Sequence, residues 1–173
     1  MEHAQESRLS LQTRRLTLVP FTAELMGLVL TDRSELARRL SAITPDEWPG
    51  PDLAEALPWL LEQRRAQPEP GEWDCLIVHT DDATVIGDLG FKGGPDAKGV
   101  AELGYSIIPS YRRQGYAFEA ARAAVDWATG RPEISRVVAE CLKDNLPSVR
   151  VLEKLGFRQT GRDGDLLLWE LDR

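Results

Sequence analysis

The sequence predicts a single α/β (α+β) domain in which helices flank a mixed sheet, and three observations favour this fold class. The chain has 173 residues, about the length of one domain, and its 42% hydrophobic and 28% charged residues are typical of a globular protein. Helical patterns fill much of the first third, and strand patterns alternate with helical ones after it. No internal repeat or long linker divides the chain. We expect a flexible N-terminus over residues 1–10 and one domain over residues 11–173.

The first third of the chain contains one strand pattern followed by two helical patterns. Residues 15–21 alternate apolar and polar side chains, as a half-buried strand does. Thr22 is a predicted N-cap, and residues 23–30 form an apolar helical stretch after it. A shorter helical pattern covers residues 34–40. These patterns predict a strand that leads directly into two helices.

A third helix is expected before the chain turns to β-structure. It covers residues 53–67, and Pro58 is expected to kink or split it because proline removes a backbone donor. The β-rich segments at residues 73–80 and 84–93 follow. Two aspartates at positions 81 and 82 lie between these segments and predict a hairpin turn.

The next strand and helix enclose a short loop. Residues 100–108 have a period-two pattern that ends with two consecutive isoleucines before Pro109. Regular strand pairing is therefore expected to stop at this point. Apolar residues from Phe118 onward recur at helical spacing, and Gly130 ends that pattern.

The last third predicts a strand, a helix and a closing hairpin. Residues 136–142 form the strand pattern, and residues 147–155 form a helical pattern that Gly156 ends. The hairpin covers residues 157–171. This order of strands and helices indicates a sheet with both parallel and antiparallel neighbours.

The chain is acidic, with a formal net charge of −7. Such a charge disfavours general binding to nucleic acid and favours basic partners or amines. No apolar run reaches the roughly 20 residues that cross a bilayer, so we expect no membrane span. The first ten residues lack the apolar core of a secretory signal, which predicts a cytoplasmic protein.

Metal chemistry and histidine chemistry are not expected. Cys75 and Cys141 lie in apolar stretches without a CxxC motif or a neighbouring cluster of histidines, so we interpret them as buried free thiols. The chain has two histidines, His3 near the N-terminus and His79, which disfavours a His-based metal site or a Ser-His-Asp triad. Catalysis is therefore expected to use carboxylates, hydroxyls or backbone groups.

The most specific local motif is YRRQGYA at residues 111–117, between a strand and a helix. Gly115 lets ligand atoms approach the backbone, and the free N–H groups at the start of a helix attract phosphate. Arg112 and Arg113 add positive charge that a pyrophosphate can use. A solvated basic turn has the same pattern, so this motif alone does not decide between the two roles.

A second motif favours the binding role. The segment DNLPSVRVLEKLGF at residues 144–157 covers a helix and its cap and follows the strand at 136–142. Together with ELGYSIIPSYRRQGYAFEA at residues 102–120, in this order and spacing, it resembles the GNAT acetyltransferase superfamily, specifically the branch of the ribosomal-protein N-terminal acetyltransferases (RimJ/RimL-like). The order of elements over residues 11–171 is also similar to that fold.

The resemblance implies a mostly antiparallel sheet whose fourth and fifth strands, here residues 100–108 and 136–142, splay apart. The opening would receive the pantetheine arm of acetyl-CoA, the co-substrate. Its pyrophosphate would lie on N–H groups of residues 113–117. Asn145 and Ser148 would lie near the thioester, although an N-cap and a first-turn hydroxyl are compatible structural roles for them. The implied cofactor-binding residues are Ile107, Ile108, Arg112, Arg113, Gln114, Gly115, Tyr116, Ala117, Asn145 and Ser148.

The implied reaction is direct attack of an amine on the acetyl thioester. It needs hydrogen bonds to the carbonyl oxygen and a proton for the departing thiolate. A backbone N–H near Ile107 is the candidate donor to the carbonyl oxygen. Many family members protonate the thiolate with a tyrosine, but this chain has Leu152 at that position. Ser148 is the alternative hydrogen-bond donor to the thiolate, directly or through water.

Two carboxylates are candidate general bases. Glu140 corresponds to the base of similar ribosomal-protein acetyltransferases, and Glu102 on the neighbouring strand is its rival, although both also suit a surface or cross-strand role. The need for a base depends on the acceptor. At pH 7 roughly 10–17% of an α-amine is neutral, against about 0.04% of a lysine amine, so an α-amine can react with a water chain as its base.

The acceptor is expected to be a primary amine on a protein N-terminus, an amino acid or a small molecule. Four tryptophans and four carboxylates outside the two motifs are candidates to select it, although core packing and a solvated acidic rim are the commoner roles. They are Trp48, Trp59, Trp73 and Trp169, and Asp46, Glu47, Asp52 and Glu55. The resemblance also implies a monomer or a homodimer.

Two other functions remain as alternatives. The missing tyrosine at Leu152 is also compatible with a non-catalytic acyl-CoA-binding module, which would bind the thioester without turnover. A phosphate-binding domain of the dinucleotide type is disfavoured, because no GxGxxG motif follows an early strand and the helical first third is out of order for that fold.

Overall fold

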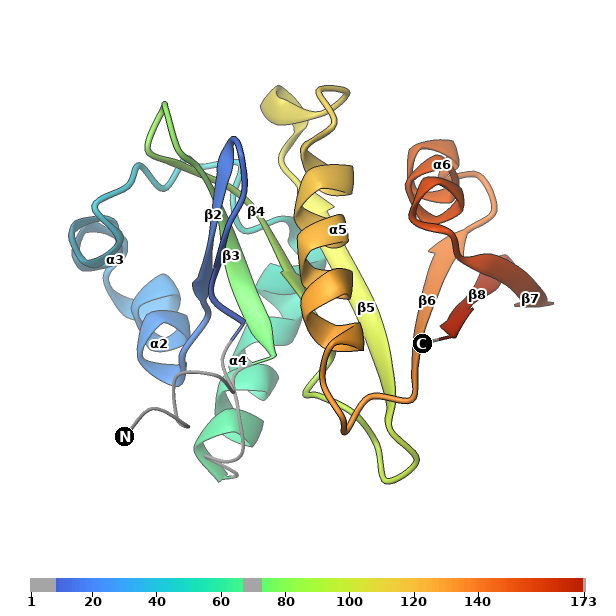
Figure 1. Ribbon diagram of the computed structural model, residues 1–173. Coiled ribbons are helices and arrows are strands. Elements are labelled where there is room, and N and C mark those ends of the chain that lie inside the picture. Colours follow the sequence, from blue (N-terminus) through green and yellow to red (C-terminus); the bar gives the residue numbers. More distant parts are fainter. Residues whose placement is uncertain (1–8, 67–72, 173) are drawn as a thin grey trace.

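An eight-stranded sheet with helices on both faces forms the part of the chain that the computed structural model describes, residues 9–66 and 73–172 (Figure 1). The strands are β1 (Leu11–Gln12), β2 (Leu16–Pro20), β3 (Asp74–His79), β4 (Thr84–Gly90), β5 (Val100–Ile107), β6 (Arg136–Leu142), β7 (Arg158–Asp163) and β8 (Leu166–Asp172). The helices are α2 (Ala23–Thr31), α3 (Arg33–Leu40), α4 (Pro51–Ala66), α5 (Tyr116–Thr129) and α6 (Leu146–Leu155), with a short 3-10 turn, η1 (Pro109–Tyr111).

The strand order is β1-β2-β3-β4-β5-β6-β8-β7. Every neighbouring pair is antiparallel except β5 and β6, which are parallel. The parallel pair is possible because α5 lies between these two strands in the sequence and carries the chain back across the sheet. The predicted mixed, mostly antiparallel sheet is confirmed.

The predicted elements are confirmed, with small differences at their ends. Thr22 caps α2, since its side chain accepts a hydrogen bond from the Leu25 N–H, as the sequence predicts. Pro58 does not split the third helix, because α4 continues through it. The expected last residue of that helix, Gln67, lies outside the described residues. The two-residue strand β1 was not predicted, because two residues are too few to show a period.

The expected flexible segment, residues 1–10, lies mostly outside the described residues. Its ninth residue, Leu9, is buried in the hydrophobic core. Cys75 and Cys141 are buried free thiols, which confirms the interpretation of their apolar surroundings. Within residues 9–66 and 73–172, no helix has both the length and the apolar character needed to cross a membrane.

Helix α5 lies against the sheet through a face of small side chains. Ala120, Ala121, Ala124 and Ala128 are all buried, and alanine allows a helix to approach a sheet closely. The helix packs on β2, β4, β5 and β6 and also meets α6. Figure 1 shows α5 in front of the sheet and α4 behind it. The start of α5 therefore lies at the same end of the sheet as the last residues of β5.

The parallel strands β5 and β6 separate after a short paired segment. Their pairing begins at Val100 with Arg136 and ends at Leu103 with Ala139. Beyond these residues, β5 pairs only with β4 and β6 only with β8 among the described strands. Figure 1 shows the two strands diverging, with α6 beside the open end. The predicted splayed strands are confirmed, and the opening between them is where the site is expected.

Candidate functional site

A cavity of about 160 Å³ lies where β5 and β6 separate. The predicted site residues Glu140, Asn145 and Ser148 line it together, although they come from a strand, a turn and a helix. The rest of the lining consists of Lys92, Leu103, Gly104, Tyr105, Ala139, Cys141 and Leu152. The structure thus brings together three of the residues that the sequence singled out.

The two candidate bases lie on the same face of the sheet but have different surroundings. Glu102 pairs with Val138 in the parallel register, and Glu140 is two residues further along β6, so both side chains share one face. Glu102 forms an ion pair with Lys92. Glu140 is exposed, lines the cavity and has no ion pair or side-chain hydrogen bond within the described chain. The geometry therefore favours Glu140 over Glu102 as a proton acceptor.

Asn145 caps helix α6 and shapes the cavity at the same time. Its side-chain oxygen accepts a hydrogen bond from the Ser148 N–H at 3.3 Å, the pattern of an N-cap. This confirms the structural role that the sequence allowed for Asn145. Because the cap fixes the first turn of α6, it also fixes the position of the Ser148 hydroxyl at the cavity.

Tyr105 is a site residue that the sequence reasoning missed. Its hydroxyl lies 2.9 Å from Ser148 Oγ, and both residues line the cavity. Burial raises the pKa of the Tyr105 phenol, while the hydrogen bond with Ser148 opposes the rise. The sequence did carry a signal. Tyr105 alternates with Leu103 and Ile107 on the inner face of its strand, where a phenol needs a hydrogen-bond partner.

Leu152 closes the wall of the cavity at the position where many family members carry a tyrosine. It follows Ser148 by one helical turn on α6 and is only 1% exposed. An aliphatic side chain donates no proton. Any hydroxyl donor on this wall must therefore come from Ser148 or from Tyr105 on the facing strand.

The loop before α5 presents its backbone to solvent. Gly115 has φ +82° and Arg113 has φ +61°, so both adopt the left-handed conformation that turns successive N–H groups outward. The N–H groups of residues 113–117 donate to no other group within the described chain. They precede a 14-residue helix whose dipole is positive at this end. Such an arrangement can bind an anion, and we therefore refer to residues 113–117 as the anion-binding loop.

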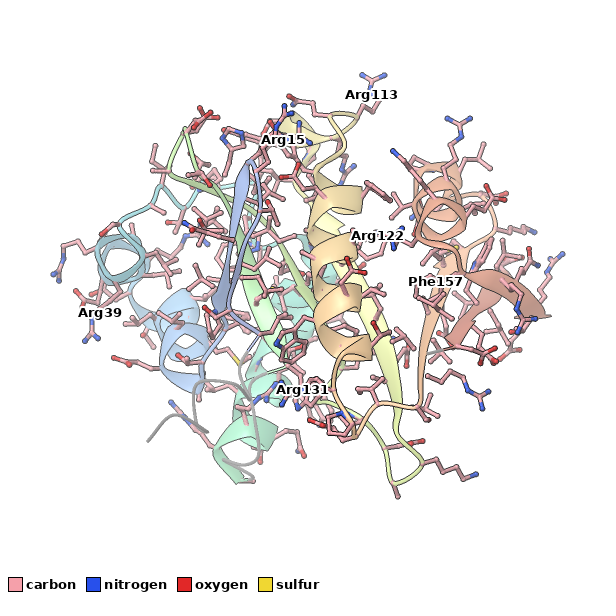
Figure 2. The ribbon with its side chains drawn as sticks, in the orientation of Figure 1. Arg15, Arg39, Arg113, Arg122, Arg131 and Phe157 are labelled. Carbon is pink, nitrogen blue, oxygen red and sulfur yellow. The ribbon has the colours of Figure 1, made fainter. Side chains whose placement is uncertain are left out.

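Arg15 on the opposite hairpin holds this loop in position. Its Nη1 donates to the Gln114 carbonyl at 3.0 Å, and its Nε donates to Glu119 at 2.7 Å. Burial would raise the pKa of Glu119, but hydrogen bonds from Thr13 and Arg15 outweigh it and lower that pKa. Figure 2 shows Arg15 close to the start of α5 and Arg113 at the outer tip of the loop.

The main chain at the end of β5 is partly free. The Ile108 N–H donates to Ile86 O at 2.9 Å, so it belongs to the contact with β4. Because consecutive N–H groups of a strand point to opposite edges, the Ile107 N–H points away from β4 and toward the opening. The Ile107 carbonyl accepts a hydrogen bond from Arg112 Nε at 2.8 Å. Arg112 thus ties the loop to the strand end.

Tyr116 and Ala117 occupy the first turn of α5. The Tyr116 ring is buried, and its hydroxyl lies 3.0 Å from His79 Nε2. The side chains of Tyr116 and His79 therefore have structural partners, and Tyr116 offers a ligand only its backbone N–H. Within the described chain, no three His, Cys, Asp or Glu side chains group in a way that could hold a metal ion.

A second hollow, of about 450 Å³, lies beside the loop that precedes α5, between α5 and α6. Arg122 and Lys154 each lie over the Phe118 ring, at 5.6 and 4.1 Å from its centroid. Figure 2 shows Arg122 in the space between the two helices. The lining residues are Thr13, Arg15, Gly115, Phe118, Glu119, Arg122, Ala123, Asp126 and Lys154. The surface next to the anion-binding loop therefore combines cations with an aromatic ring.

The chain is similar to acetyltransferases in sequence. Residues 15–158 match the family model of the acetyltransferase (GNAT) domain. The chain is 34% identical to the N-acetyltransferase YjdG of Bacillus subtilis (strain 168) over 162 residues, which are 92% of this chain and 95% of that protein. The match thus includes both the anion-binding loop and the cavity.

Solved structures have the same fold. A ribosomal-protein-S5-alanine acetyltransferase from Vibrio fischeri superimposes with a TM-score of 0.65 at 17% identity, covering 95% of this chain and 96% of that one. A microcin self-immunity acetyltransferase in complex with acetyl-CoA and AMP gives a TM-score of 0.63 at 15% identity, covering 93% and 94%. The sequence matches and the splayed strands lead to one conclusion: the chain belongs to the GNAT family of acetyltransferases and is an acyltransferase.

Proposed function

We propose that the protein transfers the acetyl group of acetyl-CoA to a primary amine, and that the amine attacks the thioester directly. The observation that carries this proposal is the cavity between β5 and β6. A carboxylate, Glu140, lines it from one face of the sheet, and a hydroxyl, Ser148, lines it from the other. A reaction that takes a proton from one reactant and gives one to the other needs such a pair.

The residues present fit acetyl-CoA as the co-substrate. The N–H groups of residues 113–117 have no partner within the described chain, and the pyrophosphate carries the negative charge that they attract. The free edge of β5 beyond Leu103 offers main-chain groups to the pantetheine amides. Acetyl-CoA, when bound, supplies the activated acetyl group.

The hollow beside Gly115 suits the adenosine end of the same molecule. It lies next to the anion-binding loop, and its Arg122 and Lys154 provide positive charge for a phosphate. The Phe118 ring provides an aromatic face at the same place. The co-substrate would then extend from this hollow, over the start of α5, into the cavity.

Each residue of the cavity has a role in the proposed reaction. Glu140 accepts a proton from the attacking amine, directly or through water. The Ile107 N–H donates to the carbonyl oxygen as negative charge develops on it. Ser148 donates to the sulfur that leaves. Glu102 is the less suitable base, because its ion pair with Lys92 already engages the carboxylate.

The acceptor is expected to approach from the face of the sheet that carries Glu140. Ser106 lies on this face and donates to Asp88 Oδ2 at 2.9 Å. Of the four candidate tryptophans, Trp48, Trp73 and Trp169 are buried core residues, whereas Trp59 is 61% exposed. The acidic net charge and a carboxylate at the cavity favour a cationic or N-terminal amine. The resemblance to ribosomal-protein acetyltransferases makes a protein N-terminus one such acceptor.

The test combines binding and turnover in one sample. Acetyl-CoA is titrated calorimetrically, and thiol release is then measured against N-terminal peptides, amino acids and small amines, with mass spectrometry of the products. We expect binding, and thiol release with an acetylated amine. Binding without an acetylated product from any amine would favour the non-catalytic acyl-CoA-binding module, and absence of binding would contradict the proposal.

A further inference from the structure

The strongest unexplained feature is the hydrogen bond between a strand residue and a helix residue that are 43 positions apart, Tyr105 and Ser148. It crosses the cavity wall next to Leu152, at the place where the GNAT tyrosine is missing. We propose that Tyr105 is the positioning residue for Ser148: it donates its hydrogen bond to Ser148 Oγ and thereby makes that hydroxyl the proton donor to the CoA sulfur. This inference rests on the proposed function.

The direction of the hydrogen bond follows from acidity. Either oxygen can donate by geometry, since the two lie 2.9 Å apart, and the Ser148 carbonyl is a second, more distant acceptor for the phenol at 3.5 Å. A phenol, with an ordinary pKa of about 10, is a far stronger acid than an alkyl hydroxyl and is the better donor. When Tyr105 donates to Ser148 Oγ, the Ser148 hydrogen is free to point into the cavity. The helix cap holds the serine backbone in place, because Asn145 accepts from the Ser148 N–H.

The surroundings of the pair keep the phenol in its protonated form. Burial raises the pKa of Tyr105, and the negative charge of a neighbouring Cys141 thiolate would raise it further. The hydrogen bond with Ser148 acts in the opposite direction but does not cancel the rise. No carboxylate forms a hydrogen bond with the Tyr105 hydroxyl within the described chain. Tyr105 therefore keeps its proton at neutral pH.

The proton transfers balance. The amine nitrogen forms a bond to the acetyl carbon, the carbon–sulfur bond breaks, and its electron pair goes to sulfur. Ser148 Oγ gives its proton to that sulfur and receives the proton of Tyr105 Oη. Glu140 takes the proton that the amine releases and passes it to solvent, and solvent returns one to Tyr105. A serine alone is too weak an acid for this step, which is why the phenol behind it matters.

The first test does not need an amine acceptor. The ionisation of the bound CoA thiol is followed by thiolate absorbance against pH, and the spectrum of the desulfo-CoA complex is subtracted to remove tyrosine signals. Donation to the thiolate lowers the pKa of the bound thiol below the ordinary thiol value of about 8.5. We expect Tyr105→Phe and Ser148→Ala each to raise it by about one unit.

Tyr111→Phe is the matched control. It removes the same atom from a tyrosine whose hydroxyl donates to Asp82 at 2.8 Å, outside the cavity. We expect this variant to titrate as the wild-type protein does. The proposal would be overturned if Tyr105→Phe bound CoA and left the pKa of the bound thiol at its wild-type value. It would also be overturned if Tyr111→Phe raised that pKa as much as Tyr105→Phe does.

The second test separates positioning from packing. We expect Tyr105→Phe to lower kcat by about 10²-fold with KM for acetyl-CoA unchanged, and the Tyr105→Phe/Ser148→Ala protein to be no slower than Ser148→Ala alone. Additive losses would mean that the two residues act separately and would overturn the proposal. If the wild-type protein lowers the pKa of the bound CoA thiol but acetylates no amine, the role of the Tyr105–Ser148 pair stands and the proposed function is contradicted. If CoA does not bind, both are contradicted.

Discussion

Glu140 and Ser148 line one cavity from opposite faces of the sheet, and this separation is the main feature of the site at the scale of single residues. A base and an acid in direct contact would exchange a proton with each other. Here the strand opening lies between them, so each group can serve a different reactant. Within the described residues the carboxylate of Glu140 has no ion pair, whereas that of Glu102 pairs with Lys92, so one neighbour distinguishes two chemically identical candidates.

Glu140→Gln tests the proposed base. Glutamine keeps the size and polarity of the side chain but accepts no proton, so we expect kcat/KM to fall by about 10²-fold or more with an amine that is mostly protonated at neutral pH. The loss should shrink as pH rises, because more of the amine becomes neutral in solution. The measurement is the pH–rate profile of thiol release for both proteins.

Glu102→Gln is the control for that experiment. Its carboxylate lies on the same face of the sheet but forms an ion pair with Lys92 at the edge of the cavity. We expect its pH–rate profile to match that of the wild type. A profile altered by Glu102→Gln and left unaltered by Glu140→Gln would reverse the assignment of the base.

Two helix starts build the site at the scale of the elements. The start of α5 supplies free N–H groups after a left-handed glycine, and the start of α6 supplies a capped first turn that holds Ser148. Both helices begin at the open end of the parallel strands, and in the proposed reaction the start of α5 would hold the phosphates and the start of α6 the thioester. The helices thus form the site through their ends, while their sides pack on the sheet.

Gly115→Val tests the α5 loop. Gly115 has φ +82°, and an added Cβ would lie 3.4 Å from Arg15 Nη2, so valine strains the backbone and displaces the loop. We expect KM for acetyl-CoA to rise at least about 10-fold, because the phosphates lose their backbone donors. Gly164→Val is the control, since Gly164 also has positive φ but lies in the β7–β8 turn with nothing within 4 Å. Equal effects of the two variants on KM would remove the loop from the site.

Asn145→Ala tests the α6 cap. We expect the free energy of unfolding to fall by about 1 kcal/mol, the usual value of a lost N-cap, and kcat to fall as Ser148 loses its fixed position. Thr22→Ala removes the equivalent cap of α2, far from the cavity. Chemical denaturation should give similar losses of stability for both variants, while steady-state kinetics should detect a loss of kcat only in Asn145→Ala. A normal kcat in Asn145→Ala would contradict the positioning role.

For the whole molecule, the sequence predicts what depends on local pattern and misses what depends on packing. The order of elements, the cap at Thr22 and the loop at Gly115 are local, because each follows from residues a few positions apart. The contact of Tyr105 with Ser148 is not local, since it requires α6 to return to β5 after 43 residues. The ion pair of Glu102 with Lys92 depends on the turn between β4 and β5 in the same way.

Asp88 lies at the centre of the sheet and gives the whole fold a predictable dependence on pH. Burial raises its pKa, although hydrogen bonds from Trp48 Nε1 and Ser106 Oγ oppose the rise. A carboxyl with a raised pKa keeps its proton in the folded protein at pH values where the unfolded chain has lost it. The free energy of unfolding therefore falls as pH rises through that window, by about 1.4 kcal/mol for each unit of elevation.

Asp88→Asn removes this dependence while keeping an acceptor oxygen for Trp48. Measured by chemical denaturation from about pH 4 to about pH 7, its stability relative to the wild type should increase with pH, because only the wild type has to ionise the buried carboxyl at position 88. The stability of Asp96→Asn relative to the wild type should change with pH in the opposite direction. Backbone N–H groups of Val100 and Lys98 lower the pKa of Asp96, so its carboxylate stabilises the fold once ionised, and the variant should lose relative stability as pH rises from about 2 to about 4, at and below the ordinary carboxyl pKa. If both variants changed in the same direction, the pH dependence would have to come from a process that both substitutions share, and the burial of Asp88 would not be its source.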